Sequence, residues 1–322
     1  MQFVIRLLVA GVFCWPSLSG PVLAQSWPQR TVHVIVPLPP GTAVDVSARL
    51  FAEHLSTRWK QPVIIENIAG ADGIIAAKEF VGKRDDHTLM YSFAGLITIN
   101  PLLYEKLPYD PARDLVPIAM SSENFLVVAA SAKLQVGSLD DLVKLARSRS
   151  AKLNWAATAG LPYFAYAGFL RNVGVEMVYV PYRDFNPALS DLGEGRIEVA
   201  SAALNQLLPH SQAGQASLLA VLNKTRSPLA PSVPTAAEAG YPDLAFDGVT
   251  GFFGWRDMPS ELRDRIAADI QAVAENPAVS DRLPTIGIVA RSSTPSEFSA
   301  AIEAQRAKVA AIAAAVGTKP AP

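Results

Sequence analysis

Strand-like apolar runs alternate with segments of helical periodicity along most of this 322-residue chain. The first such unit has an apolar run at 31–37, a proline-rich turn, and then apolar residues at helical spacing across 45–59. This alternation is typical of α/β proteins, in which helices connect strands that pair in parallel. We therefore predict an α/β fold of mostly parallel sheets flanked by helices.

The same pattern continues toward the end of the chain. Further strands are predicted at 63–66, 88–93, 126–130, 153–157, 176–180, 197–200, 218–221 and 251–255. Further helices are predicted at 73–81, 138–149, after Pro162, and at 187–194, 260–276 and 295–315. Two stretches lack either pattern: 101–117 is rich in turn residues, and 223–247 is punctuated by proline.

The length of the chain fits two domains better than one hydrophobic core. We expect a crossing back between domains at 223–247, because that stretch has little periodicity. A chain that leaves one α/β domain, builds a second and returns has the connectivity of a hinged two-lobe binding protein. Periodicity alone leaves other two-domain arrangements open.

Charge and cysteine content exclude several classes of partner and site. The chain has 28 lysines and arginines against 29 aspartates and glutamates, with no long basic block. We therefore expect no nucleic-acid partner and no binding to an anionic membrane surface. Cys14 is the single cysteine, which excludes an internal disulfide framework, a cysteine-based zinc site and an iron–sulfur cluster.

The first 24 residues have the pattern of a secretory signal peptide. Arg6 provides a positive charge, an apolar run follows at 7–15, and small residues precede a cleavage site after Ala24. Pro16 interrupts the run, which is shorter than the roughly 20 apolar residues of a membrane-spanning helix. We therefore predict a signal peptide at 1–24, which removes Cys14 from the mature protein.

Motifs of catalysis are missing from the sequence. It has no phosphate-binding Walker loop, no dinucleotide glycine fingerprint, no nucleophile elbow and no paired-histidine zinc motif. The four histidines are widely scattered, at positions 33, 54, 87 and 210. We expect no enzyme activity, no metal and no cofactor. The rival hypothesis is a small-molecule hydrolase or isomerase that uses carboxylates such as Asp45 and Asp191.

The loop after the first strand has the chemistry of a binding loop. Its prolines at 37, 39 and 40 restrict the backbone, and Gly41 lets a ligand approach closely. The loop leads into a helix, so N–H groups from Gly41 to Val44 are free to face an anion such as a carboxylate. Asp45 is interpreted either as the N-cap of that helix or as a ligand contact.

These residues also carry a family resemblance. The string Val36-Pro37-Leu38-Pro39-Pro40-Gly41, followed by Asp45, Ala48 and Arg49, resembles the opening loop and helix of the tripartite tricarboxylate transporter receptors, also called the Bug family. Similar strings follow in the family's order over essentially the whole mature chain. They are 62–67 with Gly70 and Gly73, 107–111 with Asp114, 153–156, 180–183, 187–192, 226–228, 233–235, 238–240 and 253–254.

The resemblance implies a periplasmic solute receptor whose two lobes close on a small organic carboxylate and pass it to membrane transporter subunits. It places lobe 1 at 25–124 and 247–322 and lobe 2 at 125–246, with the cleft between them. We expect hinges at 123–125 and within 223–247. We also expect a monomer. Sensing for a membrane signalling partner remains an alternative to transport, because both use lobe closure to report occupancy.

In the family, backbone N–H groups and ordered water hold the ligand carboxylate. Carried onto this sequence, the implied ligand-binding residues are Leu38, Pro39, Pro40, Gly41, Thr42, Ala43, Asp45, Phe93, Ala94, Gly95, Ala157, Thr158, Ala159, Gly160, Tyr163, Arg183 and Ala202. Arg183 matches a commonly basic position. It is expected either to pair with a second anionic group or to bridge the lobes.

The sequence departs from the family where side chains should reach the ligand. Positions that are often polar in the family are apolar at 93–97 and at 161–165, and a frequent acid–amide pair is Ala202-Ala203. A second ligand charge would find no partner there, which costs several kcal/mol. We therefore predict a ligand with one carboxylate and an apolar body covered by Phe93, Leu161, Tyr163 and Phe164. The alternative is that these side chains pack inside a lobe.

Overall fold

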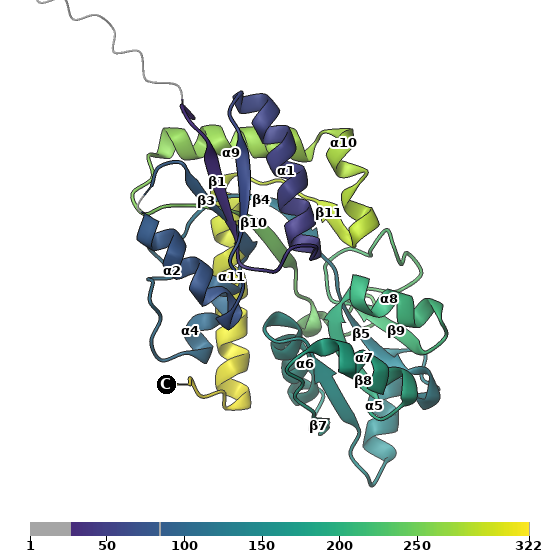
Figure 1. Ribbon diagram of the computed structural model, residues 1–322. Helices are drawn as coiled ribbons and strands as arrows, with labels where there is room; N and C mark the ends of the chain where they lie inside the picture. Colours follow the sequence, from purple (N-terminus) through teal and green to yellow (C-terminus); the bar gives the residue numbers. More distant parts are fainter. Residues whose placement is uncertain (1–26, 84, 322) are drawn as a thin grey trace, which may run out of the picture.

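The chain folds around two β-sheets, each flanked by helices (Figure 1). The computed structural model describes residues 27–83 and 85–321, so the predicted signal peptide at 1–24 lies outside the described residues. In the described ranges no helix is long and apolar enough to cross a membrane. We call the part built on the first sheet lobe 1 and the part built on the second sheet lobe 2.

The sheet of lobe 1 has six strands in the order β11-β4-β10-β3-β1-β2. Strand β1 pairs in parallel with β2 and β3, while β10 runs antiparallel to β3 and β4, and β11 antiparallel to β4. The strands are β1 Val32–Val36, β2 Val63–Asn67, β3 Thr88–Phe93, β4 Val116–Asn124, β10 Gly248–Gly254 and β11 Ile288–Ala290.

The sheet of lobe 2 has five strands in the order β7-β6-β8-β5-β9. Strand β6 pairs in parallel with β7 and β8, and β5 is antiparallel to β8 and β9. The strands are β5 Leu126–Ser131, β6 Asn154–Ala157, β7 Val178–Tyr179, β8 Val199–Ala203 and β9 Ala216–Val221.

Strand direction follows from how the chain crosses between the lobes. Strand β4 leaves lobe 1 and continues into β5 almost without a break, and β10 brings the chain back after β9. Strand β5 enters lobe 2 from lobe 1, and β10 enters lobe 1 from lobe 2. Each therefore runs away from the lobe boundary and is antiparallel to its neighbours. Apart from β5, β10 and β11, the strands of each sheet share one direction. The α/β fold is as predicted, but both sheets are mixed, because β5 and β10 lie between strands of the opposite direction and five of the nine strand pairings are antiparallel.

Helices cover both faces of each sheet (Figure 1). In lobe 1, α1 and α9 pack on one face, and α2 and α11 on the other. The helices of lobe 1 are α1 Ala43–Trp59, α2 Ile74–Lys83, α3 Gly95–Thr98, α4 Asn100–Leu103, α9 Ser260–Ala274, α10 Pro277–Ser280 and α11 Pro295–Val316. Those of lobe 2 are α5 Leu139–Ser148, α6 Leu161–Asn172, α7 Phe185–Glu194 and α8 Leu204–Gln212.

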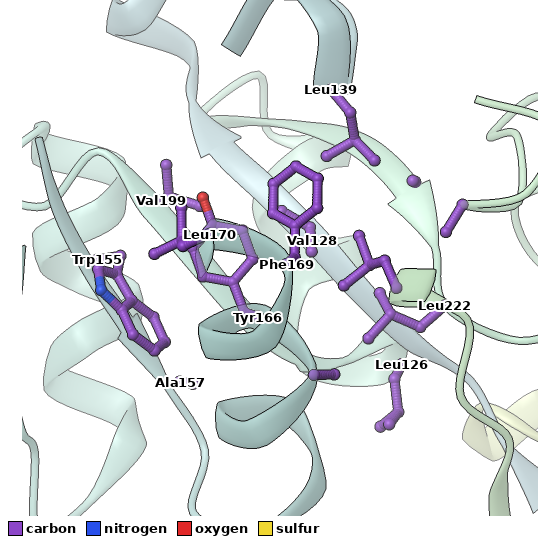
Figure 2. Close-up of a cluster of buried hydrophobic side chains, with 14 of the residues drawn as sticks. Leu126, Val128, Leu139, Trp155, Ala157, Tyr166, Phe169, Leu170, Val199 and Leu222 are labelled. Atoms are coloured by element: carbon purple, nitrogen blue, oxygen red, sulfur yellow. The ribbon is translucent and has the colours of Figure 1, made fainter. Parts of the chain in front are cut away.

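Each lobe has a core on both sides of its sheet. In lobe 2, α5 and α6 bury one face, and α7 and α8 bury the other. Figure 2 shows the first of these cores, where Trp155, Tyr166 and Phe169 gather between α6 and the sheet. Such burial of large side chains supplies most of the stability of a lobe, at about 25 cal/mol per Å² of apolar surface.

The C-terminal helix α11 belongs to the cores of both lobes. Near its start, Phe298 and Ile302 pack in lobe 1, whereas Val309 and Ala313 pack in the core of lobe 2. There α11 runs against α6, and a Cβ on Gly168 would lie 2.9 Å from Ile312 Cδ1. The helix is thus a third connection between the lobes, besides the two strand crossings.

Two elements near the crossing were not predicted. Strand β4 begins at the end of the stretch interpreted as turn-rich and continues beyond it. It was not predicted because its second half contains Ser121, Ser122, Glu123 and Asn124. These polar residues are nearly all buried, and the sequence does not reveal the partners that make burial possible. Helix α8 was missed because it contains Pro209, which normally disfavours a helix interior.

Candidate functional site

The loops after the parallel strands of the two sheets face each other across the lobe boundary. Gly160, after β6, lies beside Ile99 of lobe 1, whose Cδ1 would be 3.6 Å from a Cβ on that glycine. Asn205, after β8, lies against Gly287 of lobe 1, where a Cβ would be only 2.6 Å from the Asn205 Cβ. Ligands of open α/β sheets bind at these carboxyl edges.

The loop between β1 and α1 is closed by hydrogen bonds of its own. Thr42, not Asp45, is the N-cap of α1, and its hydroxyl accepts from the Asp45 N–H at 3.4 Å. The interpretation of Asp45 as N-cap is therefore wrong, because the helix begins two residues earlier than its apolar pattern indicates. Gly41 has φ +84, a left-handed conformation that favours glycine.

The carboxylate of Asp45 holds this loop in place through hydrogen bonds. It accepts from the N–H of Gly41 at 2.8 Å, from the side chain of Asn67 at 2.8 Å and from Arg49 Nε at 3.1 Å. Burial alone would raise the pKa of Asp45, but the bonds from Arg49, Gly41 and Asn67 outweigh it and hold the pKa below its ordinary value. Asp45 is therefore ionised and fully engaged inside the protein.

Asn67, at the end of β2, connects the loop and Asp45 to the neighbouring strand. Its amide also donates to the Leu38 carbonyl at 3.0 Å, and its oxygen accepts from Arg49 at 2.8 Å. The loop is thus fixed at both ends before any ligand arrives. Among the described residues, the N–H groups of Ala43 and Val44 have no partner, so they remain available at the start of α1.

The implied contacts after β3 are largely buried. The Ala94 N–H donates to the Val249 carbonyl at 3.3 Å, so it is not free for a ligand. Gly95 lies under the Phe93 ring, whose Cδ2 would be 2.9 Å from a Cβ there. Only the Phe93 side chain in this group is partly exposed.

The implied contacts of lobe 2 divide between core and surface. Ala157 and Ala202 are buried in the two cores, and the Thr158 N–H donates to the Ser201 carbonyl at 3.1 Å. Ala159 is exposed, and Gly160 precedes α6 with φ +87. The loop therefore offers the backbone of Ala159 and Gly160 and the partly exposed Thr158 hydroxyl.

The aromatic side chains at the start of α6 pack within lobe 2. Tyr163 stacks on Trp155, with ring centroids 5.6 Å apart and an interplanar angle of 17°. It also meets Tyr179 edge-on at 4.9 Å. Phe164 is fully buried in the core and Leu161 nearly so, so neither presents a surface to a ligand.

Arg183 lies in the connection between β7 and α7 and is exposed. In the described part of the chain it forms no ion pair or hydrogen bond. Both interpretations of this residue, pairing with a ligand anion or bridging the lobes, therefore remain predictions.

A groove of about 370 Å³ lies between the lobes, and sequence reasoning missed it. Gly41, Ala43 and Val46 form one wall, and residues 205, 208, 209 and 212 of α8 form the other. Thr285, Ile286 and Gly287 contribute from lobe 1. The helical spacing of the four α8 positions was the available signal, but the proline within it obscured the helix.

Asp85, Asp86 and His87 bring three potential metal ligands within 4.8 Å of one another. Their groups are already engaged: Asp85 accepts from Arg30 and from the Thr88 hydroxyl, and the His87 ring accepts from the Gln29 N–H. These bonds fasten the start of the described chain to lobe 1, which is a structural role.

Residues 47–318 match the sequence profile of the tripartite tricarboxylate transporter family receptors. BugT of Bordetella pertussis is 32% identical over 243 residues, which are 74% of this chain and 74% of BugT. A protein from Pseudomonas sp. strain P51, encoded between tcbD and tcbE, is 32% identical over 277 residues, covering 84% of this chain and 82% of the relative.

Solved structures show the same fold. A Rhodopseudomonas palustris protein with adipate is 30% identical, with a TM-score of 0.78 over 92% of this chain and 100% of that one. MatC from the same species, with bound malate, is 27% identical, with a TM-score of 0.73 over 89% and 100%. The chain therefore belongs to the tripartite tricarboxylate transporter receptor family, whose members are solute-binding receptors and not enzymes.

Proposed function

We propose that the protein is a periplasmic receptor that captures a small carboxylate between its lobes for uptake by membrane transporter subunits. The observation that carries this proposal is the start of α1, where hydrogen bonds fix the loop and the N–H groups of Ala43 and Val44 have no partner among the described residues. A helix N-terminus favours an anion because its N–H groups are unpaired and its dipole is positive there. The relatives solved with adipate and malate support a carboxylate ligand.

Backbone N–H groups and ordered water hold the carboxylate in this proposal. Asp45 positions the loop and does not touch the ligand, because its oxygens already accept from Gly41, Asn67 and Arg49. The lobes are 25–124 with 247–322, and 125–246, and they close as a monomer. Closure gives the ligand contacts that the open state lacks, so ligand shifts the population toward the closed state.

The ligand has one carboxylate and an apolar body. The loops after β3 and β6 contain no charged residue, and the exposed Arg183 lies in the connection after β7. A second carboxylate without a partner loses its hydration at a cost of several kcal/mol. A thermal-shift screen of monocarboxylates against citrate, malate and aspartate tests this step. Stabilisation by the polar set alone would exclude it.

Substitution of Gly41 tests the carboxylate loop. No atom lies within 4 Å of a Cβ built on Gly41, so a bulkier residue fits sterically but strains the backbone at φ +84 and moves the N–H groups. Gly174, with φ +62 and equally open space, is the matched control. We expect Gly41→Val to abolish carboxylate binding in calorimetry, while Gly174→Val leaves it intact. Equal affinities for the two variants would refute the role of the loop.

A further inference from the structure

The groove between α1 and α8 is built from one face of each helix. On α8, Asn205, Leu208, Pro209 and Gln212 follow one another at helical spacing, and they line the groove together. From residue 205 to residue 212 the helix rises about 10 Å, at 1.5 Å per residue. The groove is therefore long enough for a chain of several methylene groups.

The lining of the groove is apolar with a few neutral polar groups. Val46, Leu208, Leu229 and Ile286 supply the apolar surface, and Asn205 and Gln212 supply amides. Within the described part of the chain, no charged side chain lines it. A volume near 370 Å³ and a lining of this kind are typical of a small-molecule site.

The groove is continuous with the start of α1. Gly41 and Ala43 belong both to its wall and to the loop proposed to hold the carboxylate. Val46, one turn further along α1, is 36% exposed at this place, which is unusual for a large apolar side chain on a helix that otherwise packs into the core. A ligand held at the first loop would bury this surface.

We propose that the groove between α1 and α8 holds the uncharged chain of the ligand, so that the protein selects monocarboxylates with a medium-length apolar chain. This inference rests on the proposed function and names its substrate class. It also replaces the expected aromatic cover of the ligand body: Tyr163 is stacked on Trp155 and Phe164 is fully buried, whereas the groove is open.

Chain length gives the first test. Calorimetry on the whole mature chain compares butanoate, hexanoate and octanoate with the dicarboxylates adipate and suberate. Each added methylene that enters the groove should raise the affinity for the monocarboxylates about fourfold. The dicarboxylates should bind at least tenfold more weakly than monocarboxylates of equal length.

Two substitutions, each with a control, test whether the dependence of affinity on the ligand's chain arises in the groove. Leu208→Ala should lower octanoate affinity at least tenfold and change butanoate affinity less than threefold, whereas the half-buried Leu145→Ala on α5 should change neither. Gln212→Arg should raise suberate affinity about tenfold, because the new cation pairs with the second carboxylate. Gln206→Arg places the same charge on α8 outside the groove lining and should not.

The outcomes separate the two proposals. If no carboxylate binds the wild-type protein, the proposed function fails. If carboxylates bind but their affinity does not depend on chain length, or if Leu208→Ala behaves like Leu145→Ala, the groove inference is overturned while the receptor function stands. Tighter binding of the dicarboxylates by the wild type would also overturn it.

Discussion

The side-chain amide of Asn223 donates to Glu123 Oε1 at 2.7 Å, at the place where both strand crossings between the lobes meet. The same amide donates to the Asn124 carbonyl at 3.0 Å, and its oxygen accepts from the Leu126 N–H at 3.0 Å. Arg291 pairs with the other oxygen of Glu123. One buried asparagine thus joins the outgoing crossing at 123–126 to the chain that leads back after β9.

Asn223→Ala should destabilise the protein by about 2–4 kcal/mol, because it leaves the Leu126 N–H and one oxygen of the Glu123 carboxylate buried without a partner. Chemical denaturation measures this free energy of unfolding. Asn186→Ala, at an exposed position on α7, is the control and should change stability by less than about 0.5 kcal/mol. An equal loss in the two variants would contradict a special role for Asn223.

The strand–loop–helix unit at the start of the chain could be predicted closely. The strand expected at 31–37 is β1 Val32–Val36, and the helix expected at 45–59 is α1 Ala43–Trp59. The clustered apolar residues of α1 pack in a single core, so the period of the sequence and the geometry of the helix agree. The start of α1 was placed too late because Asp45, which is also a favoured N-cap residue type, was interpreted as the cap in place of Thr42.

The crossing and the groove could not be predicted in the same way. Ser121 and Glu123 in β4 are buried because Tyr91, Asn223 and Arg291 satisfy their polar groups, and these partners lie 30 to 168 residues away in the sequence. The groove likewise needs α1 and α8 to meet across the lobes. Periodicity describes one element at a time, whereas these features depend on contacts between distant elements.

Asp45→Ala should weaken carboxylate binding at least tenfold, although Asp45 does not touch the ligand in the proposed complex. Without the carboxylate, the Gly41 N–H and the Asn67 amide lose a common acceptor, and the loop loses its fixed shape. We also expect a loss of about 2–3 kcal/mol in stability. Calorimetry at a temperature where circular dichroism shows the variant folded measures the affinity. Wild-type affinity in a folded Asp45→Ala protein would contradict the positioning role.

The ion pair of Asp85 should make stability fall in acid. Burial would raise its pKa, but bonds from Arg30, the His87 N–H and Thr88 outweigh this and lower the pKa from 3.8 to about 2. A carboxylate with a depressed pKa stabilises the fold above its unfolded pKa, and this contribution disappears as the pH falls from about 4 toward 2. The difference corresponds to about 2 kcal/mol.

Asp85→Asn removes this contribution, so its free energy of unfolding should lie about 2 kcal/mol below the wild-type value at pH 7. The two values should converge as the pH falls toward 2. Denaturation curves between pH 2 and 7 measure this difference. A gap that is independent of pH would show that the loss comes from packing and not from ionisation.

The contact between α6 and α11 should couple the two lobes through a single glycine. An alanine Cβ at Gly168 would lie 2.9 to 3.2 Å from three atoms of Ile312, so Gly168→Ala forces the helices apart at a cost of about 1–3 kcal/mol. Ile312→Ala removes those atoms and should restore most of the loss, giving a coupling energy of about 1–2 kcal/mol in a double-mutant cycle. Gly82→Ala, on α2 with open space around it, should instead stabilise the protein by up to about 1 kcal/mol. Additive effects of Gly168→Ala and Ile312→Ala would show that α11 does not transmit strain between the lobes at this point.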